Sequence, residues 1–194
     1  MSVKDFFSLL AGVLTILAFL PYIRAILRGH ARPHVLSWII WGSTTFVVFL
    51  AQLSDGAGVG AWPIGLSGLI TLAVAGLAFR HRGDISIKRI DYLFLVAAFS
   101  ALPFWYFTSN PLWAVSILTL VDLLGFGPTF RKGYDHPHQD SLVFFMLMAI
   151  RNLLVVAALQ HYSATTVMFP ASIAVACMAY IVMVMYRRAD RRAT

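Results

Sequence analysis

A segment near the start of the chain recurs in its second half, and this repeat constrains the fold more than any other feature of the sequence. Residues 15–41 read TILAFLPYIRAILRGHARPHVLSWIIW, and residues 122–144 read DLLGFGPTFRKGYDHPHQDSLVF. The shift along the chain that carries Pro21 onto Pro128 also carries Trp62-Pro63 onto Phe169-Pro170. Two proline-anchored matches at one offset predict a tandem repeat of a single structural unit.

Composition indicates that this unit is embedded in lipid. Of the 194 residues, 60% are hydrophobic and only 12% are charged, whereas an ordinary globular domain carries about 25% charged residues. A water-soluble fold cannot cover this much apolar surface, and inside a bilayer the backbone polar groups are satisfied within helices. The net charge of +7 does not predict a nucleic-acid partner, because the bases stand in short loops between apolar runs, where they orient membrane helices.

Seven apolar stretches come close to the roughly 20 residues that a membrane crossing needs. They cover residues 5–28, 35–53, 59–79, 90–107, 111–130, 141–160 and 164–186. The predicted fold is therefore an all-α integral membrane protein with a 3+1+3 arrangement: a three-helix bundle in 1–83, a linker helix in 84–108, and a second bundle with a basic tail in 109–194. Because an odd number of crossings separates the two copies, they are expected to be parallel repeats, related by an axis along the membrane normal.

The distribution of bases predicts the orientation of the chain. Lysine and arginine in short loops favour the cytoplasmic side of a membrane. On the expected topology, Lys4 is the one base on the side of the N-terminus, and thirteen bases gather on the other side. These thirteen are Arg24, Arg28, Arg32, Arg80, Arg82, Lys88, Arg89, Arg131, Lys132, Arg187, Arg188, Arg191 and Arg192. We expect a plasma membrane, the inner membrane in a bacterium, with the N-terminus outside and the C-terminus in the cytoplasm.

The repeat resembles a known membrane family. Pro21 and Pro128 stand late in the first span of each copy, and a basic loop and then Ser37 or Ser141 follow them. With three spans, a linker span and three more, this pattern resembles the PQ-loop superfamily over nearly the whole chain, and is most similar to its SWEET and SemiSWEET sugar transporters. The resemblance implies alternating access, in which two bundles rock about a central site, and a small polar, sugar-like solute moved by uniport or with protons.

Two charged residues within the spans are the strongest candidates for a solute site. Asp122 lies near the middle of the fifth span and Arg151 near the middle of the sixth, so their depths match. A lone charge there costs roughly 2.5–3.5 kcal/mol on insertion scales, so each needs a partner, water or a ligand. One interpretation is a solute site near Thr15, Phe49, Asp122 and Arg151, in which the Asp122 carboxylate binds a proton or a polar group of the solute and Arg151 contacts an anion. The other is a buried ion pair that locks two helices together.

Prolines and tryptophans near the cytoplasmic side are candidates for a gate. Pro21 and Pro128 each remove one backbone hydrogen bond, which allows a helix to bend, although membrane helices also tolerate proline without such a role. Trp38 and Trp41 are three residues apart, so they share one helix face. They are candidates to stack on a ring-shaped solute or to close a gate, although their location favours the interpretation as aromatic anchors at the membrane interface.

Other function classes find less support in the sequence. No arrangement of residues indicates a catalytic site or a cofactor, so we expect no enzyme. His30, His34, His136 and His138 stand in the basic loops without cysteine or glutamate beside them, and we expect no metal site there. The expected partners are a small solute and the lipid bilayer, with a homo-oligomer left open. Two alternatives remain: a vitamin carrier of the nicotinamide riboside type, and a receptor of the same architecture that does not transport.

Overall fold

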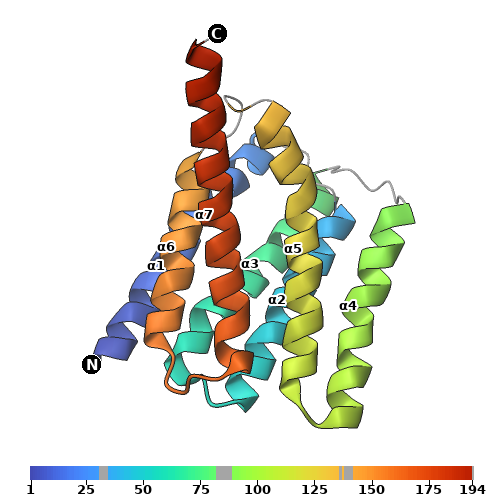
Figure 1. Ribbon diagram of the computed structural model, residues 1–194. Helices are drawn as coiled ribbons and strands as arrows, with labels where there is room; N and C mark the ends of the chain where they lie inside the picture. The colour runs from blue at the N-terminus through green and yellow to red at the C-terminus, as the bar shows by residue number, and fades with distance from the viewer. Residues whose placement is uncertain (31–34, 82–88, 136, 138–141, 194) are drawn as a thin grey trace.

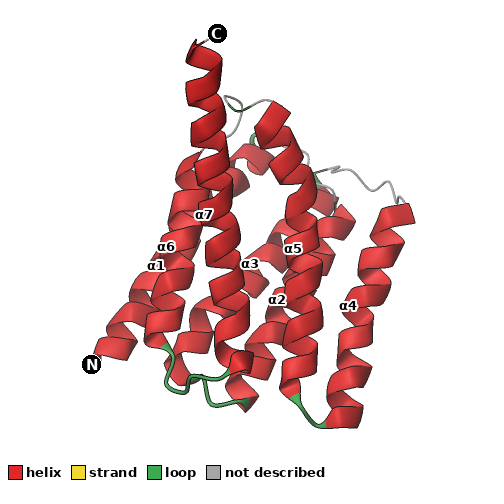
Figure 2. Ribbon diagram, in the orientation of Figure 1, coloured by secondary structure: helices red, strands yellow, loops and turns green. Residues whose placement is uncertain are grey.

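The described part of the chain is built from helices. The computed structural model describes residues 1–30, 35–81, 89–135, 137 and 142–193, and within these ranges there is no strand (Figure 2). The elements, in chain order, are α1 (Val3–Leu27), α2 (Val35–Ser54), the 3-10 helix η1 (Gly58–Ala61), α3 (Trp62–Arg80), α4 (Arg89–Thr108), α5 (Pro111–Asp135), α6 (Leu142–Ala158) and α7 (Ala164–Ala193).

Local sequence explains where the first helices begin. Ser2 and Asp5 form a reciprocal cap on α1: the Ser2 hydroxyl accepts from the Asp5 backbone N–H at 3.1 Å, and the Asp5 carboxylate accepts from the Ser2 backbone N–H at 2.7 Å. This pairing satisfies donors that a helix N-terminus otherwise leaves free. Pro63 occupies the first turn of α3, where its missing N–H costs no hydrogen bond.

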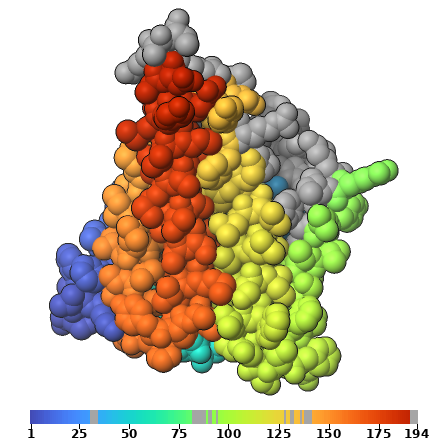
Figure 3. Space-filling view, in the orientation of Figure 1, coloured from blue at the N-terminus to red at the C-terminus, as the bar shows by residue number. Residues whose placement is uncertain are grey.

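The helices form a closed arrangement around an interior. Helix α3 packs against both α1 and α2, and α7 packs against both α5 and α6. Between these two groups, α1 packs on α6 and α2 packs on α5, whereas α4 lies beside α5 at the edge of the molecule (Figures 1 and 3). The shift that carries Pro21 onto Pro128 carries α1 onto α5 and α2 onto α6. The α1–α6 contact and the α2–α5 contact are therefore equivalent under the repeat. Helices α1, α2, α5 and α6 therefore face one another across the interior.

Several helices are long and apolar enough to cross a membrane. By length and composition, Val3–Leu27, Val35–Ser54, Gly58–Arg80 and Ala164–Asp190 qualify. Shorter apolar helices cover Leu95–Thr108, Pro111–Gly127 and Leu142–Ala158. The outer surface is also apolar, with Tyr106 and Phe107 of α4 80% and 82% exposed. Continuous apolar surface of this kind marks contact with lipid or a partner, and with helices of this length it indicates a membrane-embedded protein.

The two ends of the chain lie at opposite ends of the helix bundle (Figure 1). Helix α1 starts at the lower end in this view, and α7 finishes at the upper end. Arg24 stands in the last turn of α1, Arg80 in the last turn of α3, and Arg187 near the end of α7, so all three lie toward the end that carries the C-terminus. The bundle therefore has one strongly basic end among its described residues.

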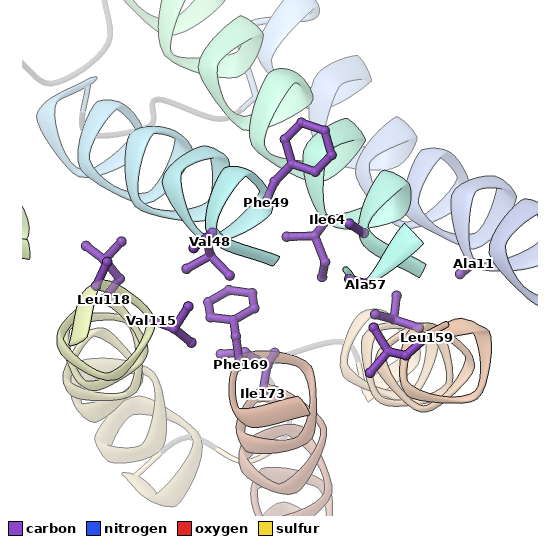
Figure 4. Close-up of a cluster of buried hydrophobic side chains, with 14 of the residues drawn as sticks. Ala11, Val48, Phe49, Ala57, Ile64, Val115, Leu118, Leu159, Phe169 and Ile173 are labelled. Atoms are coloured by element: carbon purple, nitrogen blue, oxygen red, sulfur yellow. The ribbon is translucent and has the colours of Figure 1, made fainter. Parts of the chain in front are cut away.

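A dense apolar core fills the end of the bundle that carries η1. Val48 of α2, Val115 and Leu118 of α5, and Phe169 of α7 converge there, and each is at most 3% exposed (Figure 4). Gly60 of η1 lies so close to α6 that a Cβ at this position would stand 2.8 Å from the Cα of Leu159. The two groups of helices therefore meet without a gap at this end.

Candidate functional site

A cavity of about 900 Å³ lies between the two groups of helices. Its walls come from α1, α2 and α3 on one side and from α5, α6 and α7 on the other. Lining residues include Tyr22 near the end of α1, Val143 at the start of α6, and Asp122 and Arg151 nearer the middle of the bundle. The cavity thus runs from mid-bundle toward the basic end, and its volume is in the range of small-molecule sites.

Arg151 is the largest fully buried side chain of the described residues, and it is only 2% exposed. Its Nε donates to Thr15 Oγ1 of α1 at 3.1 Å, one terminal nitrogen donates to Asn152 Oδ1 at 2.8 Å, and the other donates to the Pro63 carbonyl of α3 at 2.6 Å. All three acceptors are neutral. A buried cation therefore ties α6 to α1 and α3, and it has no carboxylate within ion-pair distance in the part of the chain that the structure describes.

Asp122 reaches the same cavity from α5, where it is partly buried. Its Oδ1 accepts a hydrogen bond from Thr44 Oγ1 of α2 at 3.1 Å, and the same hydroxyl also lies 2.9 Å from the Trp41 carbonyl. The interpretation as a buried ion pair between Asp122 and Arg151 does not describe this arrangement, because each charge is held by a threonine. Both predicted charges nonetheless line one cavity.

The two charged contacts correspond to each other under the sequence repeat. The shift that carries Pro21 onto Pro128 also carries Thr15 onto Asp122 and Thr44 onto Arg151. The Thr15–Arg151 and Thr44–Asp122 contacts, both 3.1 Å long, are therefore images of one another. Thr44 was not among the residues predicted from sequence, although applying the shift to Arg151 identifies it directly.

Aromatic side chains line much of the cavity, including both candidate gate tryptophans. Trp38 stacks on Tyr22 of α1 with ring centroids 4.9 Å apart and an interplanar angle of 19°. It also contacts the edges of Phe19 and Trp41, at centroid distances of 6.4 and 6.0 Å. A Cβ at Gly125, about one turn of α5 beyond Asp122, would lie 3.0 Å from the Trp41 Nε1, so this glycine lets the indole approach the α5 backbone.

Of the other predicted site residues, Thr15 is at the site and Phe49 is not. Thr15 is fully buried beneath Arg151, where its hydroxyl accepts from the guanidinium and donates to the Ala11 carbonyl at 2.8 Å. The Phe49 ring instead packs against Trp62 at the start of α3, with centroids 5.6 Å apart, and it does not line the cavity. Its position along α2 matches the site in depth, but the ring lies on the side of α2 that faces α3.

The two candidate hinge prolines lie inside continuous helices. Pro21 lines the cavity, and α1 continues through it to Leu27. Pro128 stands within α5 (Pro111–Asp135), and its side chain lies outside the described set. Whether either helix bends there during function stays a prediction.

The opposite end of the cavity is sealed by polar contacts as well as by the apolar core. Lys4 Nζ donates to the Leu159 carbonyl at 2.7 Å, and Gln52 Nε2 donates to the Thr166 carbonyl at 2.8 Å. Ser163 Oγ, in the loop before α7, hydrogen-bonds to Asp55, the residue that follows α2. Each contact links α1, α2 or the residue that follows α2 to the segment around the end of α6 and the start of α7. These contacts close the bundle at the end that carries the N-terminus.

The described residues contain no group of three His, Cys, Asp or Glu side chains placed to hold a metal ion. His30 belongs to this described set, whereas His34, His136 and His138 lie outside it. No family model, no curated protein and no solved structure matches the chain. A function for this chain must therefore be inferred from the residues that line the cavity.

Proposed function

We propose that this chain is an alternating-access membrane transporter for a small polar solute. The observation that carries the proposal is the cavity of about 900 Å³ between the two helix groups, which holds Asp122 and Arg151 and is closed at one end. A transport site needs polar groups at mid-membrane, in a space that communicates with one side at a time. Intramembrane charges that face a cavity are typical of such sites.

The proposed membrane topology has seven spans in a 3+1+3 arrangement. Helices α4, α5 and α6 contain 20, 25 and 17 residues, and membrane helices of about 17–25 residues are common. The α1–α6 and α2–α5 contacts, which the repeat exchanges, support two bundles in 1–83 and 109–194 joined by a linker helix in 84–108. The basic end supports a cytoplasmic C-terminus and an external N-terminus in a plasma membrane.

On this topology the cavity faces the cytoplasm, so the arrangement corresponds to an inward-facing step of the cycle. The contacts of Lys4, Gln52 and Asp55 then form the external gate. Opening this gate requires the two bundles to separate near η1 while they approach at the basic end, where Pro21 and Pro128 are the proposed hinges and Trp38 and Trp41 the proposed closing surface. The cycle needs no covalent step, no metal and no cofactor.

The class of solute has two candidates within transport. The resemblance to SWEET proteins favours a sugar-like solute, and polar groups such as Asp122 suit its hydroxyls. The aromatic wall favours a solute with a planar ring, as in a carrier of the nicotinamide riboside type, because stacked Trp38 and Tyr22 offer a flat surface. Competition among sugars, nucleosides and vitamins for one labelled ligand would distinguish them.

Flux through reconstituted protein tests the transport proposal. A thermal-shift screen of the purified protein against sugars, nucleosides, vitamins and amino acids identifies a ligand, and counterflow of that ligand is then measured in proteoliposomes. We expect the protein to accelerate equilibration, and Asp122→Asn to reduce it. A ligand that stabilises the protein but shows no flux in either direction would overturn the proposal and favour a receptor of the same architecture.

A further inference from the structure

The cavity presents one cation and one anion that are kept apart. Arg151 donates one hydrogen bond from each of its three nitrogens, and all three acceptors are uncharged. A guanidinium carries five N–H donors, so two have no partner among the residues that the structure describes. A carboxylate accepts about four hydrogen bonds, and Asp122 receives one, from Thr44. Both groups therefore retain hydrogen-bonding capacity toward the cavity.

Neutral threonines keep these two charges from neutralising each other. Two opposite charges in an apolar interior are ordinarily paired directly, because burial of a charge is costly unless it has an opposite charge or hydrogen bonds. Here Thr15 of α1 and Thr44 of α2 hold Arg151 and Asp122 on separate helices, α6 and α5. Among the described residues that line the cavity, Arg151 of α6 is the one base and Asp122 of α5 is the one acid, so the positive and negative groups stand on different helices.

We propose that this cavity binds a zwitterionic solute, with the solute carboxylate on Arg151 and its ammonium group on Asp122. The inference rests on the proposed transport function and specifies the substrate class of the same site. A carboxylate fits the planar donor set of a guanidinium, and an ammonium group supplies the donors that the Asp122 carboxylate lacks. A solute that carries both charges satisfies both groups at once and adds no net charge to the membrane interior.

The wall around Asp122 fits the ammonium end of such a solute. The Trp41 indole stands beside the α5 backbone at Gly125, about one helical turn from Asp122, and the side chains of Trp41 and Asp122 both line the cavity. Indole is the best aromatic partner for a cation, so a cavity lined by both Trp41 and Asp122 suits an ammonium group. Apolar and aromatic groups line most of the remaining cavity, including Phe145, Phe169 and Trp38. We therefore expect a solute with an apolar or aromatic body, between an amino acid and a dipeptide in size.

Three ligands of nearly the same shape test the proposal by direct binding to the purified full-length protein. They are phenylalanine, which is zwitterionic; phenylalaninamide, which keeps only the cation; and N-acetylphenylalanine, which keeps only the anion. The dipeptide alanyl-phenylalanine and its two blocked forms repeat the comparison at a longer charge separation. Loss of one charge-assisted contact lowers affinity by about tenfold to a hundredfold, so in at least one series the zwitterion should bind that much more tightly than both blocked forms.

Each charge-removing variant should abolish the preference for the zwitterion over one of its two blocked forms. In Asp122→Asn the acetylated ligand should bind as tightly as the zwitterion, and in Arg151→Gln the amide should do so. Asp190→Asn, at an exposed ion pair with Arg187 on α7, is the matched control and should bind like the wild type. Because Arg151 joins three helices, Arg151→Gln is the variant that risks misfolding. If it does not fold, the comparison of ligands in Asp122→Asn alone decides whether the proposal holds.

The outcomes separate this inference from the transport proposal. The inference is overturned if neither zwitterion binds, or if a blocked form binds as tightly as its zwitterion in both series. The transport proposal would still hold in that case if the protein moved another solute. If a zwitterion binds with the expected selectivity but is not moved across proteoliposomes, the site assignment holds and the transport function fails.

Discussion

Replacing Thr15 and Thr44 by valine should have unequal effects on stability, although each threonine holds one charge at 3.1 Å. Thr15→Val removes the acceptor for the Nε of Arg151. Thr15 is fully buried and does not line the cavity, so no solvent replaces that acceptor for the Nε, although other atoms of Arg151 reach the cavity. Thr44→Val removes a donor to Asp122, but this carboxylate lines the cavity, where water can supply the missing hydrogen bond.

The expected magnitudes follow from this difference in access. An unsatisfied buried polar group costs about 1–3 kcal/mol, and hydrogen bonds between membrane helices contribute about 0.6 kcal/mol on average and about 1.7 at most. We therefore assign about 1.5 kcal/mol to Thr15→Val and about 0.6 kcal/mol to Thr44→Val. For a chain of this length, 1 kcal/mol shifts the melting temperature by roughly 2–4 °C. The expected decreases in Tm are about 3–6 °C for Thr15→Val and about 1–2 °C for Thr44→Val.

Thermal unfolding of the detergent-solubilised protein, at one fixed heating rate, measures these shifts. A fixed rate is needed because unfolding in detergent is often irreversible, so the midpoint depends on the scan. Thr119→Val is the matched control: Thr119 is 3% exposed, and its hydroxyl has no partner among the described residues, so removing that hydroxyl should leave Tm unchanged or raise it. Equal losses for Thr15→Val and Thr44→Val, or a larger loss for Thr44→Val, would refute the assignment of Arg151 as the more deeply held charge.

Three further predictions concern gating, protons and topology. A Cβ at Gly60 would lie 2.8 Å from the backbone that follows α6, so Gly60→Ala should loosen the packing at the sealed end. In a background without the native cysteine, this change should raise the thiol labelling of Ala57→Cys several-fold. Unchanged labelling would contradict a gate at this end. A proton on Asp122 removes its negative charge, so Asp122→Asn should flatten the pH profile of solute uptake while exchange of bound solute continues, and an unaltered profile would exclude this carboxylate from coupling. Impermeant reagents should label Ser2→Cys and Asp190→Cys from opposite faces of the membrane, and labelling of both from one face would end the seven-span proposal.

The sequence pointed to two charged candidates because the bilayer makes intramembrane charge rare. Asp122 and Arg151 stood out for that reason, and both line the cavity. What the sequence left open was whether they pair, because depth along a helix does not determine which neighbouring helix a side chain meets. That choice depends on helix rotation and on threonines, such as Thr44, that are unremarkable in an apolar sequence.

Helix location was similarly easier to predict than helix orientation about its axis. The stretch predicted at 35–53 corresponds to α2 (Val35–Ser54), and that at 59–79 to the segment Gly58–Arg80. Phe49 lies within α2, yet its ring packs toward Trp62 and away from the cavity. Its hydrophobicity cannot distinguish lipid, core and cavity, because all three environments accept an aromatic side chain in a membrane protein.

The crossed pairing of Thr15 with Arg151 and Thr44 with Asp122 shows what a chain with two non-identical halves can do that a symmetric dimer cannot. In a two-fold symmetric dimer of the second half alone, position 122 of each copy would face position 151 of the other, and two identical salt bridges would neutralise all four charges. A dimer of the first half would set threonine against threonine and carry no charge at all. A single chain whose two halves differ avoids both outcomes. Each charge can be paired with a threonine of the other half, so the acid and the base need not form a salt bridge.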